Sequence, residues 1–157
     1  MTPAIDEATA AGIELGVHPY EHDPAHESFG LEAAEALGVD PGEIFKTLVV
    51  RLDRGELVMA VVPVIATVDL KAVASACTAK KAEMADPQLA ERTTGYVVGG
   101  ISPLGSRKRL AVVLDETALA SDRIYCSGGR RGLDISMPPE DLIRLANAAV
   151  ADIARWG

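Results

Sequence analysis

Two glycine-rich segments carry the residue types best suited to chemistry. The first, residues 95–105, contains the pair Gly99 and Gly100, and the second, residues 125–134, contains Ser127 and Asp134. Glycine lets a ligand approach the main chain closely, so both segments could present amide N–H groups to ligand oxygens. The serine, the aspartate and the adjoining cations would add side-chain chemistry. Tight turns without a ligand are the alternative that the spacing leaves open.

A lysine interrupts an apolar, strand-like run. Lys46 lies within the segment 45–50, and strand alternation places it on the same face as Leu48. A charged group on an inward face is costly unless it meets an anion or a pocket. Lys46 is therefore a candidate functional residue. The alternative is a lysine at a strand edge that keeps its ammonium in water.

Several common catalytic arrangements are disfavoured. Three histidines recur every fourth residue: His18, His22 and His26. Prolines 19 and 24 make a helix there improbable, so we expect no metal site. Motifs of serine hydrolases, phosphate-loop NTPases and zinc proteases do not occur. Ser127 has no base beside it in sequence, which favours a hydrogen-bonding role over acylation.

Composition favours one cytoplasmic domain. A chain of 157 residues with 48% hydrophobic and 4% aromatic residues can bury an aliphatic core. It has neither an apolar run of membrane-spanning length nor the start of a signal peptide, so we expect a cytoplasmic protein without a membrane partner. Cys77 and Cys126 lack metal-ligand spacing and are expected to be reduced thiols. A catalytic Cys126 is the alternative.

The pattern of apolar residues and turn signals predicts helices and strands in irregular order. Helices are expected from Thr2 to Gly12, over 31–37, 70–77 and 87–92, and from Pro138 through Ile153. Strands are expected over 15–20, 45–52, 57–64, 110–114, 124–126 and 133–137. Such an order predicts a single α+β domain with a mixed sheet instead of a doubly wound fold.

Longer motifs point to a known family. They include Thr2-Pro3-Ala4, Tyr20 to Pro24, Phe29-Gly30, Phe45 to Leu48, Lys80 to Pro87, Thr94 to Tyr96 and both glycine-rich segments. Together they resemble the bacterial YbaK-type Cys-tRNA(Pro) deacylases, the YbaK/EbsC family, which is related to the editing domain of prolyl-tRNA synthetase. The resemblance runs from Thr2 to about Arg155. It implies one editing domain over 1–157, with a mostly antiparallel mixed sheet or partial barrel packed by helices.

The resemblance also implies an activity. The expected reaction is trans-editing, the removal of Cys mischarged onto tRNA(Pro), with Cys-tRNA(Cys) as a further substrate. The substrate's own thiol would attack its ester carbonyl and form a thiolactone, so no cofactor or metal is expected. One alternative is a related deacylase that removes Ala by water attack. Another is a non-catalytic module that binds aminoacyl-tRNA or a synthetase.

Site residues follow from the same resemblance. The expected catalytic residues are Lys46, Gly99, Ser127 and Asp134. The expected substrate-binding residues are Tyr20, Phe29, Thr47, Gly100, Ile101, Ser102, Pro103, Gly128 and Arg130. Gly99 and Pro103 match a G-x-x-x-P loop whose amides would face the substrate carbonyl.

Charge bears on the expected partners, which are the 3′ end of tRNA(Pro) and prolyl-tRNA synthetase. The net charge of −8 argues against tight unaided binding of nucleic acid, and no DNA partner is expected. Basic residues nevertheless cluster at Lys80-Lys81, Arg107 to Arg109 and Arg130-Arg131. A local basic rim around a pocket would suit the 3′ end of a tRNA, whereas a solvated charged face is the alternative for the lysine pair.

Overall fold

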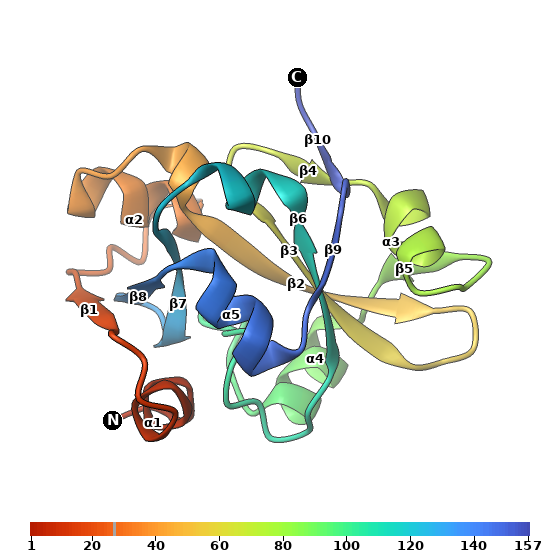
Figure 1. The fold of residues 1–157 in the computed structure, drawn as a ribbon, viewed down its shortest axis with the longest axis horizontal. Helices are drawn as coiled ribbons and strands as arrows, with labels where there is room; N and C mark the ends of the chain where they lie inside the picture. The colour runs from red at the N-terminus through yellow and green to blue at the C-terminus, as the bar shows by residue number, and fades with distance from the viewer. Residues whose placement is uncertain (27) are drawn as a thin grey trace.

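A mixed five-stranded sheet forms the centre of the computed structural model, which describes residues 1–26 and 28–157. Its order is β5 (Ala82–Met84), β2 (Phe45–Leu52), β3 (Leu57–Pro63), β6 (Ala111–Asp115) and β9 (Ala149–Ala151). β2 pairs antiparallel with both β3 and β5, whereas β3 with β6 and β6 with β9 are parallel. Figure 1 shows β2 and β3 crossing the middle of the molecule.

A smaller antiparallel sheet lies beside the start of β2. Its order is β1 (Gly16–Pro19), β8 (Leu133–Met137) and β7 (Ile124–Arg130). A parallel bridge between Ile44 and Tyr125 joins the two sheets. A short antiparallel pair, β4 (Thr67–Val68) with β10 (Ala154–Arg155), completes the strands of the described chain. The predicted α+β domain with a mixed sheet is confirmed; the central sheet has two antiparallel and two parallel pairings, whereas the two smaller sheets are antiparallel.

Helices cover the sheets, and most begin where side-chain caps predict. They are α1 (Pro3–Ala10), α2 (Phe29–Leu37), α3 (Leu70–Ala76), α4 (Pro87–Thr94) and α5 (Pro139–Ala146), with 3-10 turns at Pro41–Glu43 and Glu116–Ala120. Thr2, Asp69 and Asp86 each accept a backbone N–H three residues on, which satisfies one of the free donors of a helix start. α2 begins at Phe29, two residues earlier than predicted, because Ser28 is its cap. No helix of the described residues is long and apolar enough to cross a membrane.

Side chains on the two faces of β2 pack into two separate hydrophobic cores. Phe45 and Val49 face the larger core, which lies between the two sheets. Val50 and Leu52 face a second core that includes Val73 of α3. This alternation matters for the site, because the side chains of neighbouring residues on β2 point to opposite sides of the sheet.

The closing helix is shorter than the apolar spacing predicts. It ends at Ala146, and Asn147 takes a left-handed conformation with φ of 51°. Beyond it, Val150 pairs with Leu114 in the central sheet. The buried carboxylate of Asp115 accepts the N–H groups of Ile153 and Ala154, each at 2.9 Å, and so holds the chain extended. The prediction of a helix through Ile153 is therefore wrong.

Candidate functional site

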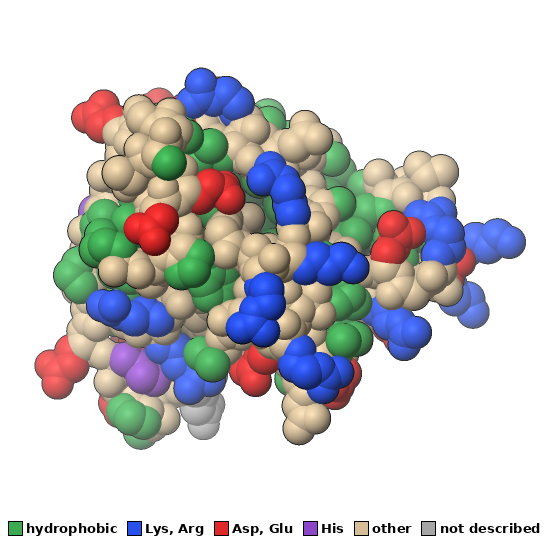
Figure 2. All heavy atoms as spheres, turned by 90° about the horizontal axis from the view of Figure 1, so that it is seen from below, with side chains coloured by type: hydrophobic (Ala, Val, Ile, Leu, Met, Phe, Trp, Pro, Cys, Tyr) green, Lys and Arg blue, Asp and Glu red, His purple; other side chains and the backbone are tan. Residues whose placement is uncertain are grey.

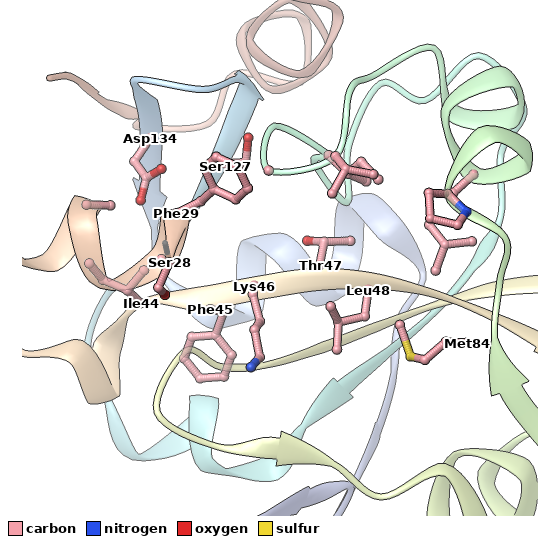
Figure 3. A pocket seen from close by; sticks show the side chains of 18 of the residues that line it. Ser28, Phe29, Ile44, Phe45, Lys46, Thr47, Leu48, Met84, Ser127 and Asp134 are labelled. Atoms are coloured by element: carbon pink, nitrogen blue, oxygen red, sulfur yellow. The ribbon is translucent and has the colours of Figure 1, made fainter. Parts of the chain in front are cut away.

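A cavity of about 370 Å³ lies against the open edge of β2. Its walls come from the start of α2, the first half of β2, the end of β5, the start of α4, the loop after α4, and β7 with β8. Figure 3 shows residues from these elements around it. The size and the mostly apolar lining are typical of a small-molecule site.

The edge of β2 is open because β5 is short. β5 pairs only with residues 50–52, so residues 45–48 have a sheet neighbour, β3, on one side. The carbonyl of Val49 points to the β5 side, where it accepts the N–H of Ala85 at 3.0 Å. Backbone groups alternate along a strand, so Thr47 directs its N–H and C=O to the same edge, toward the cavity. The buried Oγ1 of Thr47 has no hydrogen-bond partner among the described residues.

Lys46 contributes a free cation. It lines the cavity half-buried, and within the described chain it forms no ion pair. In Figure 3, Lys46 and Leu48 point to the side of β2 opposite to Thr47, as alternation predicts. Partial burial lowers the pKa of its ammonium from the ordinary value, because water is replaced by protein. An anionic ligand could therefore pair with Lys46 without displacing a protein carboxylate.

Asp134 and Ser127 form the polar end of the cavity. They are cross-strand partners on β8 and β7, and both side chains are labelled at that end in Figure 3. Asp134 is 5% exposed, and its Oδ2 has no partner among the described residues. Burial raises the pKa of this carboxyl group to about 7. Ser127 Oγ accepts the N–H of Gly129, also on β7, at 3.1 Å, and this hydrogen bond fixes the position of the hydroxyl.

Tyr20 and Phe29 complete this end. Both line the cavity. Burial and the nearby Asp134 raise the pKa of the Tyr20 phenol, so it stays a hydrogen-bond donor at neutral pH. The Arg131 guanidinium lies 4.7 Å from the centre of the Phe29 ring. Its Nε also donates to the carbonyl of Val98 at 2.9 Å, which ties the loop to the ring.

Of the two loop glycines, Gly99 has the available amide. Gly99 lines the cavity with φ of 90°, and its N–H has no acceptor within residues 1–26 and 28–157. The N–H of Gly100 instead donates to the carbonyl of Val97 at 2.8 Å. The following residue, Ile101, is buried and also lines the cavity. Gly99 is thus the loop glycine whose amide is available to donate to a ligand oxygen.

Five of the expected substrate-binding residues lie outside the cavity lining: Gly100, Ser102, Pro103, Gly128 and Arg130. Here the structure differs from the expectation, and three of the five, Gly100, Ser102 and Gly128, make contacts that hold the loops. A Cβ on Gly100 would lie 2.8 Å from the backbone of Arg130, and the carbonyl of Gly128 accepts the Thr2 hydroxyl. Ser102 is fully buried, and its Oγ accepts the N–H of Leu104 at 3.3 Å.

The other two residues of this group face elsewhere. Pro103 lines a separate, smaller pocket of about 90 Å³, together with Glu7 and Arg109. Arg130 is exposed at the end of β7. The next cation in the chain, Arg131, is the one that reaches the cavity wall, because it packs on Phe29.

The three histidines serve the scaffold. His18 Nε2 lies 2.8 Å from Ser136 Oγ, and His26 Nε2 lies 3.4 Å from Glu35 Oε2. His22 Nδ1 lies 2.7 Å from Oε1 of the buried Glu32, whose other oxygen accepts the N–H of Asp23 at 2.6 Å. No group of three potential metal ligands occurs among the described residues. The Glu32 contacts hold the loop before α2, and thereby the helix turn that presents Phe29.

Both thiols are free. Cys126 is 1% exposed and does not line the cavity, and burial raises its pKa strongly. Cys77 is partly buried beneath Arg54, whose guanidinium donates to its carbonyl. A thiol that stays protonated and inaccessible is a poor nucleophile. The geometry therefore disfavours a catalytic Cys126.

Met84, Leu48 and Val98 are lining residues that the sequence interpretation missed. Apolar residues in strands and near helices normally enter a core, so their types carry no signal of a ligand. One signal was available for Met84. It lies within the Lys80 to Pro87 motif.

Cations gather on one face despite the acidic composition. Figure 2 shows Lys and Arg side chains across the face seen from below, which includes the region of α4 and its following loop. Exposed cations in this region include Arg92, Arg107, Lys108 and Arg131. Such a local concentration favours a negatively charged ligand next to the cavity.

The fold and the site define a class of small α+β domains with a mostly apolar cavity. Among the described residues, this cavity contains a lysine without an ion pair, a buried carboxyl group and a loop amide without an acceptor. The model of the aminoacyl-tRNA editing domain matches residues 22–145. A protein of Enterococcus faecalis, named as a candidate Cys-tRNA(Pro)/Cys-tRNA(Cys) deacylase, EbsC, is 42% identical over 120 residues, covering 76% of this chain and 73% of that protein. The chain belongs to the aminoacyl-tRNA editing domain family.

Solved structures agree with this assignment. A candidate trans-editing enzyme for prolyl-tRNA synthetase superimposes with a TM-score of 0.82 at 27% identity, over 99% of both chains. The structure of a hypothetical protein superimposes with a TM-score of 0.88 at 25% identity, over 98% of this chain and 99% of that one. The described architecture is therefore that of an editing domain.

Proposed function

We propose that this protein is a trans-editing deacylase that removes Cys mischarged onto tRNA(Pro), with residues 1–157 acting as one editing domain. Membership of the editing family supports a deacylase. The name of the Enterococcus faecalis relative supports Cys as the amino acid, and the trans-editing structural neighbour supports tRNA(Pro) as the carrier.

One observation carries the mechanism. Within the described residues, neither a histidine nor a cysteine lines the cavity, and Ser127 has no base among its hydrogen-bond partners. A serine without a base is a poor nucleophile. This disfavours a protein nucleophile. In the proposed mechanism the attacking group comes from the substrate, whose Cys side chain supplies a thiol of suitable reach.

In this reaction the protein mainly positions the substrate and supplies no nucleophile of its own. The substrate sulfur attacks the carbonyl carbon of its own ester and forms a C–S bond in a four-membered thiolactone. The bond from that carbon to the ribose oxygen breaks, and the thiol proton ends on this oxygen, which frees the tRNA. Holding the thiol near the carbonyl supplies part of the rate, since well-oriented intramolecular reactions gain about 7–11 kcal/mol.

The cavity residues have distinct roles in this proposal. Gly99 donates its amide to the developing oxyanion, and Lys46 binds the terminal phosphate or ribose. Asp134 and Ser127, with Tyr20 and Thr47, bind the polar atoms of the aminoacyl group at the closed end. Phe29 and Ile101 form the apolar wall next to the aminoacyl group. Gly100, Ser102 and Gly128 support the loops that place these groups.

Selectivity follows from the nucleophile. Serine fits the same space, but its hydroxyl is rarely ionised at neutral pH and attacks poorly, whereas a thiol has a pKa near 8.5. Alanine has no nucleophile and would need a bound water. We also propose that prolyl-tRNA synthetase supplies the tRNA specificity that the acidic body lacks, and that the enzyme acts in the cytoplasm.

Deacylation of Cys-, Ala- and Ser-tRNA(Pro) tests the proposal, with and without prolyl-tRNA synthetase. Wild-type protein should release Cys alone, and Lys46→Ala should lose on the order of a hundredfold or more in rate. Lys71→Ala, an exposed lysine on α3, is the matched control and should be unchanged. Preferential release of Ala would assign water attack instead. Release of none of the three would favour a non-catalytic binding module.

A further inference from the structure

The cavity has two unlike ends. The end formed by Tyr20, Ser127 and Asp134 is polar; Asp134 is buried, and Tyr20 and Ser127 are half-buried. The rest of the lining includes the apolar residues Met84, Pro87 and Val98, which are exposed to solvent, and the half-buried Leu48. Met84 is 48% exposed and Val98 is 38% exposed. In Figure 3, Met84 and Leu48 lie at the opposite side of the view from Asp134.

The two ends fix the direction of a bound substrate. An aminoacyl group carries an ammonium, which suits the buried carboxyl group of Asp134 with its unpartnered Oδ2. The ester continues into the terminal ribose, its base and the remaining tRNA. We expect this part to leave past the exposed apolar residues, because the space beside the buried Asp134 is too small for a tRNA.

We infer that the apolar slot between Met84 and Val98 binds the adenine base of the terminal adenosine. This inference rests on the proposed function, since it needs an adenosine ester as substrate. A purine presents two flat apolar faces, and apolar side chains on two sides of a slot bury them from water. Methionine suits this contact, because its thioether is polarisable and adapts to a ring.

A cation lies near the slot, as expected for a site that binds a nucleotide. Arg131 donates to the carbonyl of Val98, so its guanidinium lies beside the slot. It can meet the phosphates that precede the terminal nucleotide. An exposed apolar slot bordered by a cation fits a base with its phosphate better than it fits a free apolar molecule.

Methionine methyl NMR tests the slot without catalysis. The chain contains Met1, Met59, Met84 and Met137, and Met59 and Met137 are fully buried, so they serve as internal controls. The probe is an uncharged acceptor microhelix of tRNA(Pro) that ends in CCA. It should shift the Met84 methyl signal through the ring current of adenine and leave Met59 and Met137 unmoved. The same microhelix with an abasic terminal nucleotide should not shift Met84. An unmoved Met84, or equal shifts with both microhelices, would overturn the inference.

Kinetics provides the second test. Wild-type protein should cleave Cys from the intact microhelix with a KM about tenfold below that for the abasic one, at similar kcat. Met84→Ser and Val98→Ser should lose this preference, and Met84→Leu should keep it. Leu119→Ser, at a residue 52% exposed and outside the lining, is the control. Equal cleavage of both microhelices by wild-type protein, or variants that weaken both equally, would overturn the inference.

The two proposals fail in different ways. If wild-type protein cleaves neither Cys-microhelix, the proposed function is wrong, and the Met84 shift alone then decides whether the slot binds adenine. If it cleaves both equally, the deacylase stands and the adenine slot is wrong.

Discussion

The ring of Phe29 lies directly against the α-carbon of Gly99. A Cβ at Gly99 would stand 2.7 Å from Cδ2 of that ring, closer than real contacts allow. The first residue of α2 and the loop after α4 thus meet in the cavity wall, although they are far apart in sequence. This contact fixes the conformation of the loop at Gly99, whose amide is the oxyanion donor in the proposed mechanism.

Substitution of Gly99 by Ala should impair both stability and deacylation. The new Cβ meets Phe29, and the φ of 90° is unfavourable for any L residue. We expect a loss of about 1–3 kcal/mol in the free energy of unfolding, and a deacylation rate lowered on the order of a hundredfold. Denaturant unfolding and single-turnover deacylation measure the two effects.

Gly55→Ala is the matched control for this experiment. Gly55 lies at a hairpin tip with φ of 93°, and a Cβ there would meet nothing within 4 Å. It therefore carries the backbone strain without the collision. If both variants lose equal stability and both keep full activity, contact with Phe29 does not position the loop.

Asp134→Asn should stabilise the protein at high pH while it impairs activity. Burial raises the pKa of this carboxyl group from 3.8 to about 7, so the folded state binds a proton that the unfolded state has released. Between these values the stability of the wild-type protein should fall as pH rises. At pH 8 the variant should be more stable by about 1–4 kcal/mol. Urea unfolding at pH 5 and pH 8 should show a larger difference at the higher pH, and an equal difference at both would contradict the burial argument.

Glu32→Gln should destabilise the loop before α2 at neutral pH. Burial opposes ionisation of Glu32, but its contacts with His22 and the Asp23 N–H outweigh this and lower the pKa of its carboxyl group. The stabilisation is therefore present above the ordinary pKa near 4.5 and is lost as pH falls through the lower folded value. We expect a loss of about 1–3 kcal/mol at pH 7, measured by thermal or urea unfolding.

Glu35→Gln provides the comparison for Glu32. Glu35 is 75% exposed, and its contact with His26 is long at 3.4 Å. A surface pair contributes little, so this variant should unfold like the wild type. A similar loss in both variants would mean that burial of Glu32 is not the cause.

Cys126→Ala should retain deacylation. The thiol is buried in the core outside the cavity, so its removal leaves a small void and a cost of roughly 1–2 kcal/mol in unfolding free energy. Turnover of Cys-tRNA(Pro) under conditions where the variant is fully folded measures its role. A loss of activity in folded protein would restore Cys126 as a catalytic candidate.

Local physics allowed much of the fold to be predicted from sequence. Thr2, Asp69 and Asp86 mark helix starts because a side-chain oxygen satisfies a free N–H within one turn. Strand alternation likewise placed Lys46 with Leu48 on one face of β2. The identities of Lys46, Asp134 and the glycine loops were recognisable because their motifs are contiguous.

Only the tertiary structure decided which of these residues share the cavity. Ser127 and Asp134 meet through the register of β7 and β8, and Gly99 meets Phe29 through the packing of two distant segments. The end of α5 depended on the buried carboxylate of Asp115, which accepts N–H groups from a segment whose apolar spacing is helical. The sequence by itself determined residue types and local conformations. The tertiary structure decided the open edge of β2, the burial of Asp134 and the exposed slot at Met84, because these depend on contacts between residues that no local pattern brings together.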